Sequence, residues 1–459
     1  MSFASWQFGV FAAIVFGGYY LPPVRNCQVQ WLVLASLFFY GYGQPELLPL
    51  LAVAVLGSYL FLVLALEQRR VFLPLGIAFN LALLALFKYK FLVFDLSAPA
   101  MVGFAPVDVL LRLPLPIGIS FFVFHNISLL VDLTRQKAAR PDLTSVFLYI
   151  IFFPQLVSGP ITRAENFLPQ IKPKFFADVD FVEAAKWIVI GFFFKLYVAN
   201  NLNAMTTYID FPLYQTLNPQ DRWTLVVLYS FQIYADFFGY SSIALGLGLL
   251  FGYRLPVNFN LPYISRSFSE FWTRWHISLS AWLRTYLYIP LGGNRHGRLR
   301  TYLNLMIVMG LGGLWHGAAL GYLAWGLLHG LFLVIERPCL PVFERLSSIA
   351  ALRGGVYAFR ALFVFTCVSF AWIFFKLPNV EHAMSFVGGM FANHAVGAGP
   401  RIYRSLALIY SLPVLLQHWV PWPRLEPYTQ RLQPYIYGGM AVLAMVDAGA
   451  DTSFIYFQF

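Results

Sequence analysis

Long apolar runs separated by short charged clusters constrain the fold of this chain more than any other feature. The longest run without Asp, Glu, Lys or Arg covers residues 301–335, between Arg300 and Glu336. Hydrophobic residues make up 59% of the 459 residues, and charged residues make up only 11%. So few polar side chains could not cover the surface of a soluble protein of this length. The sequence therefore predicts a polytopic membrane protein, and apolar spans of this kind predict an all-α fold.

Many runs approach the about 20 apolar residues that a membrane-spanning helix needs. They cover residues 6–21, 30–43, 47–66, 71–87, 117–133, 144–157, 182–198, 223–251, 301–335, 356–375, 402–420 and 435–446. Some are too short to cross a bilayer upright, so tilted or re-entrant segments are expected. We predict a single membrane domain over residues 1–459, with roughly 11–13 helices around a buried histidine cavity.

The distribution of charged residues argues against a nucleic-acid partner, and the spacing of the cysteines argues against a metal site or a redox pair. The net charge is +11, and basic residues concentrate in short loops at Arg69-Arg70, 135–140 and 295–300. Short basic loops between spans stay in the cytoplasm, so this charge indicates topology and no nucleic-acid partner. The three cysteines are far apart in the sequence, so neither a metal site nor a redox pair is expected.

The run at 301–335 is too long to be one helix. As a continuous helix it would extend about 52 Å, against an apolar bilayer core of about 30 Å. It must therefore break, and a group of glycines marks the expected place. These are Gly310, Gly312, Gly313 and Gly317. The break would lie beside His316.

His316 is the strongest candidate for a functional residue. An ionisable side chain at membrane depth is costly, so its presence predicts a function. Histidine exchanges a proton near neutral pH, and the neighbouring Trp315 and glycines leave room for a ligand. The alternative is a neutral histidine that forms a hydrogen bond between helices.

A second histidine lies in an aromatic and basic segment. Ser267 and Glu270 have the spacing of a capping box, which predicts a helix from Phe268 to about Tyr288. At helical spacing one face is aromatic and the other is charged, with His276 on the flank. The aromatic face carries Phe268, Phe271, Trp272, Trp275, Leu279, Trp282 and Tyr286, and Glu270, Thr273, Arg274 and Arg284 lie opposite. The alternative is an interfacial helix with aromatics at headgroup level and arginines at phosphates, and a packed His276.

Other polar residues lie inside apolar runs. Asp236 is near the middle of the run at 223–251, and a buried carboxylate needs a partner. Pairing with an arginine or a backbone amide is the structural alternative to a functional role. His125, Asp132 and His329 are interpreted as hydrogen-bonding groups between helices. The residues alone fit either an enzyme with a histidine base or a carrier with His316 and Asp236 as a proton relay.

Several motifs follow one another along the chain. They are FFPQLVSGPI at 152–161, the stretch 234–246, NFN at 258–260, EFWTRWHISLS at 270–280, YLYIPLGGNR at 286–295, GGLWHG at 312–317 and FIYFQF at 454–459. Their order resembles the membrane-bound O-acyltransferase (MBOAT) superfamily, and most of all its bacterial polysaccharide O-acetyltransferase branch. The resemblance is strongest over residues 152–329. Ser242 and Thr285 depart from the branch at positions where Asp is common, so acidic groups are not expected to act there.

The resemblance implies a site, a reaction and partners. His316 matches the family's catalytic histidine and His276 its second polar position, with Trp315, Asp236, Arg274 and Trp275 as supporting residues. The implied reaction moves an acetyl group from a cytoplasmic thioester, acetyl-CoA, to an exopolysaccharide such as alginate or cellulose. The implied location is the bacterial inner membrane, with esterase-like periplasmic proteins as partners and no bound cofactor. The D-alanine branch that acts on teichoic acids shares the RWH and WHG motifs and is the alternative.

Overall fold

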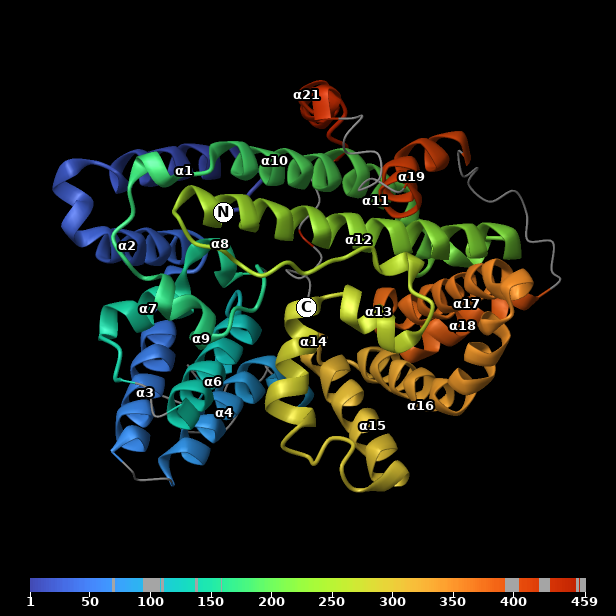
Figure 1. Ribbon diagram of the computed structural model, residues 1–459, viewed down its shortest axis with the longest axis horizontal. Helices are drawn as coiled ribbons and strands as arrows, with labels where there is room; N and C mark the ends of the chain where they lie inside the picture. Colours follow the sequence, from blue (N-terminus) through green and yellow to red (C-terminus); the bar gives the residue numbers. More distant parts are fainter. Residues whose placement is uncertain are drawn as a thin grey trace. The chain divides into compact units, whose positions relative to one another are not determined.

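The computed structural model describes residues 1–67, 71–93, 108, 111–136, 139–157, 159–392, 404–420, 430–450 and 454. Within these residues the chain forms helices and loops without a strand, which confirms the predicted all-α class (Figure 1). The basic pair Arg69-Arg70 and the last five residues of the FIYFQF motif lie outside the described residues.

The chain divides into two compact units. Unit 1 comprises Met1–Ile188 and Ser241–Pro256, and unit 2 comprises Val189–Tyr240 and Val257–Phe459. The predicted motif core at 152–329 contributes residues to both units. The single domain over residues 1–459 stays a prediction.

Unit 1 is built from helices whose buried polar groups pair with one another. Its elements are α1 (Trp6–Tyr19), α2 (Gln28–Gly41), α3 (Leu48–Leu66), α4 (Phe72–Val93), α6 (Ile119–Gln136), α7 (Leu143–Ile151), α8 (Phe153–Leu156), α9 (Ala164–Phe167) and most of α10 (Phe181–Phe192). The backbone N–H of Thr162 donates to Nε2 of His125 over 3.2 Å, and Arg163 lies 3.7 Å from Asp132. These contacts support the structural interpretation of His125 and Asp132.

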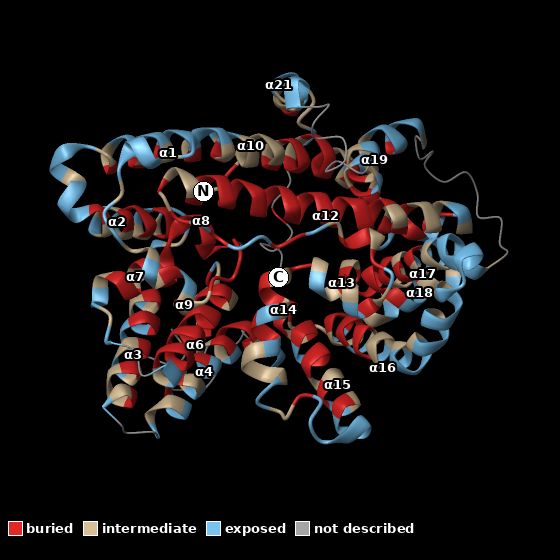
Figure 2. Cartoon of the chain, in the orientation of Figure 1, coloured by how far each residue is buried: buried red, intermediate tan, exposed pale blue. Residues whose placement is uncertain are grey.

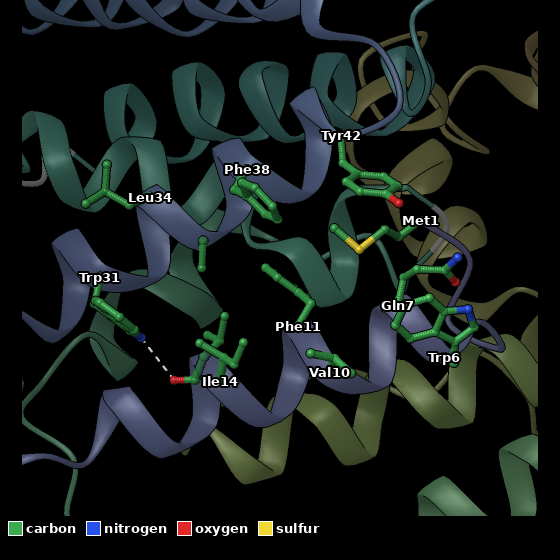
Figure 3. Close-up of a pocket in the computed structure, with 12 residues that line it drawn as sticks. Met1, Trp6, Gln7, Val10, Phe11, Ile14, Trp31, Leu34, Phe38 and Tyr42 are labelled. Carbon is green, nitrogen blue, oxygen red and sulfur yellow. Dashed lines mark hydrogen bonds between the residues drawn. The ribbon is translucent and has the colours of Figure 1, made fainter.

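α1 and α2 enclose an apolar groove of about 510 Å³ (Figure 3). The segments Trp6–Tyr19 and Pro22–Gly41 pass the criteria for a membrane span only as a pair, and they are bent by 91°. The Trp31 indole N–H donates to the Val15 carbonyl over 3.0 Å and ties the two helices together. The bent pair bears out the expectation of segments that do not cross the bilayer upright.

Unit 2 begins inside α10 and contains the segments that carry both candidate histidines. Its elements are a π-helical segment (Phe193–Asn200), α11 (Asn201–Thr206), most of α12 (Pro219–Leu250), α13 (Phe268–Arg274), α14 (Ile277–Leu283), a second π-helical segment (Arg284–Tyr288), α15 (Gly297–His316), α16 (Leu320–Ser348), α17 (Ala350–Lys376), α18 (Val380–Phe391), α19 (Arg404–Trp419) and α21 (Gln433–Val446). α12 is buried along most of its length (Figure 2).

Five helices of the described residues are long and apolar enough to cross a membrane, or six with the bent pair. They are Pro45–Leu66, Phe72–Lys90, Pro219–Leu250, Leu320–Ser348 and Ala350–Lys376. The chain is therefore a multi-pass membrane protein, as predicted.

The long run breaks as predicted, beside His316. Of the four glycines expected to mark the break, only Gly317 lies at it. α15 ends at His316 and α16 begins at Leu320. Gly310, Gly312 and Gly313 lie within α15, so the prediction that they mark the break was wrong. Gly313 instead lets the two helices pack closely, because a Cβ there would lie 2.2 Å from the Tyr322 carbonyl oxygen.

The prediction of one continuous helix from Phe268 to about Tyr288 was also wrong. α13 ends at Arg274, and His276 adopts a left-handed conformation before α14 begins. A right-handed helix cannot continue through such a residue. The Ser267 cap is confirmed, since its hydroxyl accepts from the Glu270 N–H over 2.9 Å.

Candidate active site

His316 is the last residue of α15 and is buried among aromatic rings. Its ring centroid lies 4.9 Å from Trp315, 5.1 Å from Trp325 and 5.1 Å from Phe375. The next residue, Gly317, leaves the helix in an extended conformation. A Cβ on Gly317 would lie 2.2 Å from the Tyr322 ring, so only glycine fits at this exit. Gly317 thus lets the chain leave α15 close to the Tyr322 ring, directly after the imidazole.

His276 lies between α13 and α14 with φ 43° and ψ 54°. Non-glycine residues rarely adopt this region, and such strain gathers at functional sites. The side chain is buried, and its ring lies edge-on to Phe237 with centroids 4.6 Å apart. The alternative of an interfacial position for His276 is therefore replaced by a position inside the protein.

Asn258 and Asn260, in the loop that precedes α13, form hydrogen bonds with the chain on both sides of His276. The Asn258 carbonyl accepts from the Ile277 N–H over 3.0 Å, and Asn258 Oδ1 accepts from the Ser278 hydroxyl over 2.6 Å. On the other side, the Asn260 N–H donates to the Arg274 carbonyl over 2.9 Å. Asn258 is almost completely buried, so these bonds form without competition from water. The NFN motif thus stabilises the strained turn.

Trp315 brings the two histidines together. Its ring lies 6.2 Å from His276 and 4.9 Å from His316, measured between centroids. All three side chains belong to unit 2 and are at most 5% exposed. For His276, burial among apolar rings lowers the pKa and favours the neutral imidazole over the charged form. A neutral imidazole is the form that can act as a general base.

Asp236 has a lysine partner that the sequence did not predict. Its carboxylate lies 2.6 Å from Lys195 Nζ, and both side chains are buried. Lys195 belongs to the π-helical segment Phe193–Asn200, and such segments are frequent at functional sites. The next residue, Phe237, contacts the His276 ring. The pair therefore anchors the stretch of α12 against which His276 packs.

Arg274 and Trp275 shape the segment before His276. Arg274 Nε donates to Glu270 over 3.0 Å, and Nη1 donates to the Asn260 carbonyl over 3.0 Å. Trp275 is 2% exposed and packs 5.0 Å from Trp372. The predicted aromatic face is thus packed against protein and not against lipid headgroups.

Two further histidines are buried near these residues. His329 in α16 is fully buried, and neither ring nitrogen has a hydrogen-bond partner among the described residues. His418 in α19 lies 4.8 Å from Tyr234 and lines a cavity of about 170 Å³. No pattern in the sequence singles out His418, because it lies near the end of its apolar run.

No group of three His, Cys, Asp or Glu side chains that could hold a metal ion occurs in the described parts of the chain. The site consists instead of two histidine side chains in an aromatic surrounding. Such a site can transfer a proton and exclude water, which is what acyl transfer between a thioester and a hydroxyl requires.

Residues 38–376 match the sequence model of the membrane-bound O-acyltransferase family. The chain is 37% identical over 391 residues to the probable alginate O-acetylase AlgI of Pseudomonas putida, which covers 83% of this chain and 78% of that protein. It is 35% identical over 400 residues to the peptidoglycan O-acetyltransferase of Helicobacter pylori, which covers 80% of this chain and 74% of that protein. The teichoic acid D-alanyltransferase of Streptococcus thermophilus is 31% identical over 240 residues and covers 48% of this chain and 56% of that protein.

Proposed function

Because the chain belongs to the membrane-bound O-acyltransferase family, we propose that it acetylates hydroxyl groups of a bacterial exopolysaccharide such as alginate or cellulose. The donor is a cytoplasmic thioester, acetyl-CoA. The observation that carries the proposal is that His276 and His316 both lie beside Trp315, with ring centroids 6.2 Å and 4.9 Å from it. Family membership also favours an enzyme over the proton-coupled carrier that the residues alone allow.

In the proposed reaction His316 acts as the general base. Its imidazole takes the proton from the acceptor hydroxyl as the oxygen attacks the thioester carbonyl. The carbon–sulfur bond then breaks, and the thiolate leaves with the proton that the imidazolium returns. General base catalysis of this kind contributes about 10²–10⁴-fold.

His276 positions the reactants beside His316. Its left-handed backbone fixes the direction of the ring, and Phe237 and Trp315 restrict its movement. Orientation of reactants supplies a large part of enzymatic rate enhancement. Asp236, Arg274 and Trp275 act indirectly. Asp236 holds the part of α12 whose Phe237 contacts the His276 ring, and Arg274 and Trp275 hold the segment that precedes His276.

The proposed setting is the bacterial inner membrane. The basic stretch at 295–300 is exposed and includes the first residues of α15, which favours a cytoplasmic position for that end of the helix. The acceptor polymer is reached from the periplasmic side, with esterase-like proteins as partners. No bound cofactor is needed, because the donor thioester supplies the acyl group.

Two relatives define the alternative functions. The Helicobacter pylori relative is also named as an enzyme that transfers acetyl groups, but its named acceptor is peptidoglycan. The Streptococcus thermophilus relative transfers D-alanine to teichoic acid, and its match covers a smaller share of the chain. The acetyl donor is therefore favoured over a D-alanyl donor.

Membrane vesicles from the host, supplied with acetyl-CoA labelled in the acetyl group, test the proposal. Base-labile label is expected in the exopolysaccharide fraction, in amounts that depend on the enzyme. Label in peptidoglycan instead would change the acceptor. Incorporation from a D-alanyl thioester, with none from acetyl-CoA, would overturn the proposed donor.

A further inference from the structure

The N-terminus of α13 is held by a carboxylate from another helix. Glu336 of α16 accepts from the Phe268 N–H over 2.7 Å and from the Ser269 N–H over 3.1 Å. The Ser267 hydroxyl takes the next donor, the Glu270 N–H. The first three N–H groups of a helix have no partner inside it, and a negative charge there is favourable. Glu336 thus completes a cap that Ser267 alone leaves unfinished.

Glu336 belongs to a stripe of α16 that faces α13. The stripe consists of Trp325, His329, Phe332 and Glu336, which lie three or four residues apart and therefore on one face. Phe332 stacks on Phe268 with centroids 4.7 Å apart. His329 and Trp325 lie 5.1 Å and 5.8 Å from Trp272. One helix face therefore contacts α13 from its first turn to its second.

The same stripe reaches the other histidine. The Trp325 ring lies 5.1 Å from His316. At its opposite end, Glu336 fixes the start of α13, and α13 ends at Arg274, two residues before His276. The length of α13 is only about 10 Å, so a displaced first turn displaces the segment with Trp275 as well.

From this arrangement we infer that Glu336 is a positioning residue of the acyltransferase site, which holds α13 in register and so sets the place of His276 relative to His316. The inference rests on the proposed function, because it assigns Glu336 a role in that reaction. Glu336 does not contact the reacting atoms. Its carboxylate acts through the backbone of α13.

Three variants test this role. Glu336→Ala loses both hydrogen bonds from the Phe268 and Ser269 N–H groups, while Glu336→Gln keeps one acceptor oxygen. Glu344→Gln is the matched control, since Glu344 is an exposed residue of the same helix. The readouts are the maximal rate and the KM for labelled acetyl-CoA in host membrane vesicles, at equal abundance of the enzyme.

We expect Glu336→Ala to lower the maximal rate about 10²-fold, as a displacement of about 1 Å does in other enzymes. Glu336→Gln recovers part of the rate, the KM changes less than about twofold in both, and Glu344→Gln matches the wild type. An unchanged rate in Glu336→Ala would refute the inference. A raised KM with an unchanged maximal rate would also refute it, since Glu336 would then bind the donor.

Hydrogen exchange separates this inference from the proposed function. Glu336→Gln is expected to speed amide exchange in the peptide covering residues 268–278, whereas Glu344→Gln is not. If wild-type vesicles transfer no acetyl group, the proposed function fails while the exchange result still tests the anchoring of α13. Unchanged exchange at residues 275–278 would overturn the positioning role even in an active enzyme.

Discussion

Gly313→Ala is expected to disable the enzyme by separating two helices next to His316. Gly313 lies in α15, three residues before the histidine. Its added Cβ would lie 2.2 Å from the Tyr322 carbonyl oxygen and 3.1 Å from the Gly326 Cα, against 3.4–4 Å for ordinary contact. Both neighbours are backbone atoms of α16, so no side-chain rotation relieves the clash. α15 and α16 must therefore separate by about 1.2 Å at this point, since close-packed interiors leave no other space.

The size of the loss follows from this displacement. Overpacking of this kind costs about 1–3 kcal/mol of stability. A misplacement of about 1 Å at a catalytic group costs about 10²-fold in rate, which corresponds to about 2.7 kcal/mol in the barrier. Gly313→Ala is therefore expected to stay in the membrane but to transfer acetyl groups about 10²-fold more slowly.

Gly310→Ala is the control on the same helix. A Cβ at Gly310 would lie 3.2 Å from Leu327 Cδ2 and 3.6 Å from Leu323 Cδ1, and both are ends of flexible side chains. Its rate is expected to stay within about twofold of the wild type. The assay is label transfer from acetyl-CoA to polymer in vesicles, divided by the amount of enzyme. Equal rates for the two variants would show that the close contact of α15 and α16 does not set the position of His316.

Three other predictions follow from the site. His276→Asn and His276→Gly should both lose most activity while the protein stays at normal abundance, because Asn and Gly tolerate the left-handed backbone at this position. His276→Val should lose activity and also lower the melting temperature of the purified protein. A normal melting temperature for the valine variant would contradict backbone strain at φ 43°. Lys195→Met should destabilise the protein by about 3–5 kcal/mol, more than Lys195→Met with Asp236→Leu, because the single change breaks a buried ion pair by removing one member only; a more stable single variant in thermal unfolding would refute the buried pair. A cysteine placed at His296 should react with an impermeant thiol reagent only after the inner membrane is opened, whereas labelling in intact cells with a permeabilised outer membrane would reverse the topology.

Much of this architecture could be predicted from local patterns. The length of the run at 301–335 required a break, and the glycine after His316 marked the place where α15 ends. The spacing of Ser267 and Glu270 identified the start of α13. Such features depend on neighbours in the sequence, so composition and spacing reveal them.

The features that were missed depend on residues far apart in the sequence. The break at His276 is stabilised by Asn258, which lies on a preceding loop. Helical periodicity continued smoothly across the break and gave no sign of it. The partner of Asp236 is Lys195, 41 residues away, and the cap of α13 comes from Glu336. Pairing between distant segments requires the tertiary structure.

The central claim is that His316 carries the acyl-transfer chemistry. Replacement by alanine removes the base, and His296→Ala removes an exposed histidine near the start of the same helix. The measurement is the O-acetyl ester content of the secreted polymer in cells that contain equal amounts of each variant in the membrane. The account predicts no ester above background with His316→Ala and wild-type ester with His296→Ala. Wild-type ester content with His316→Ala would contradict the account and make this histidine structural.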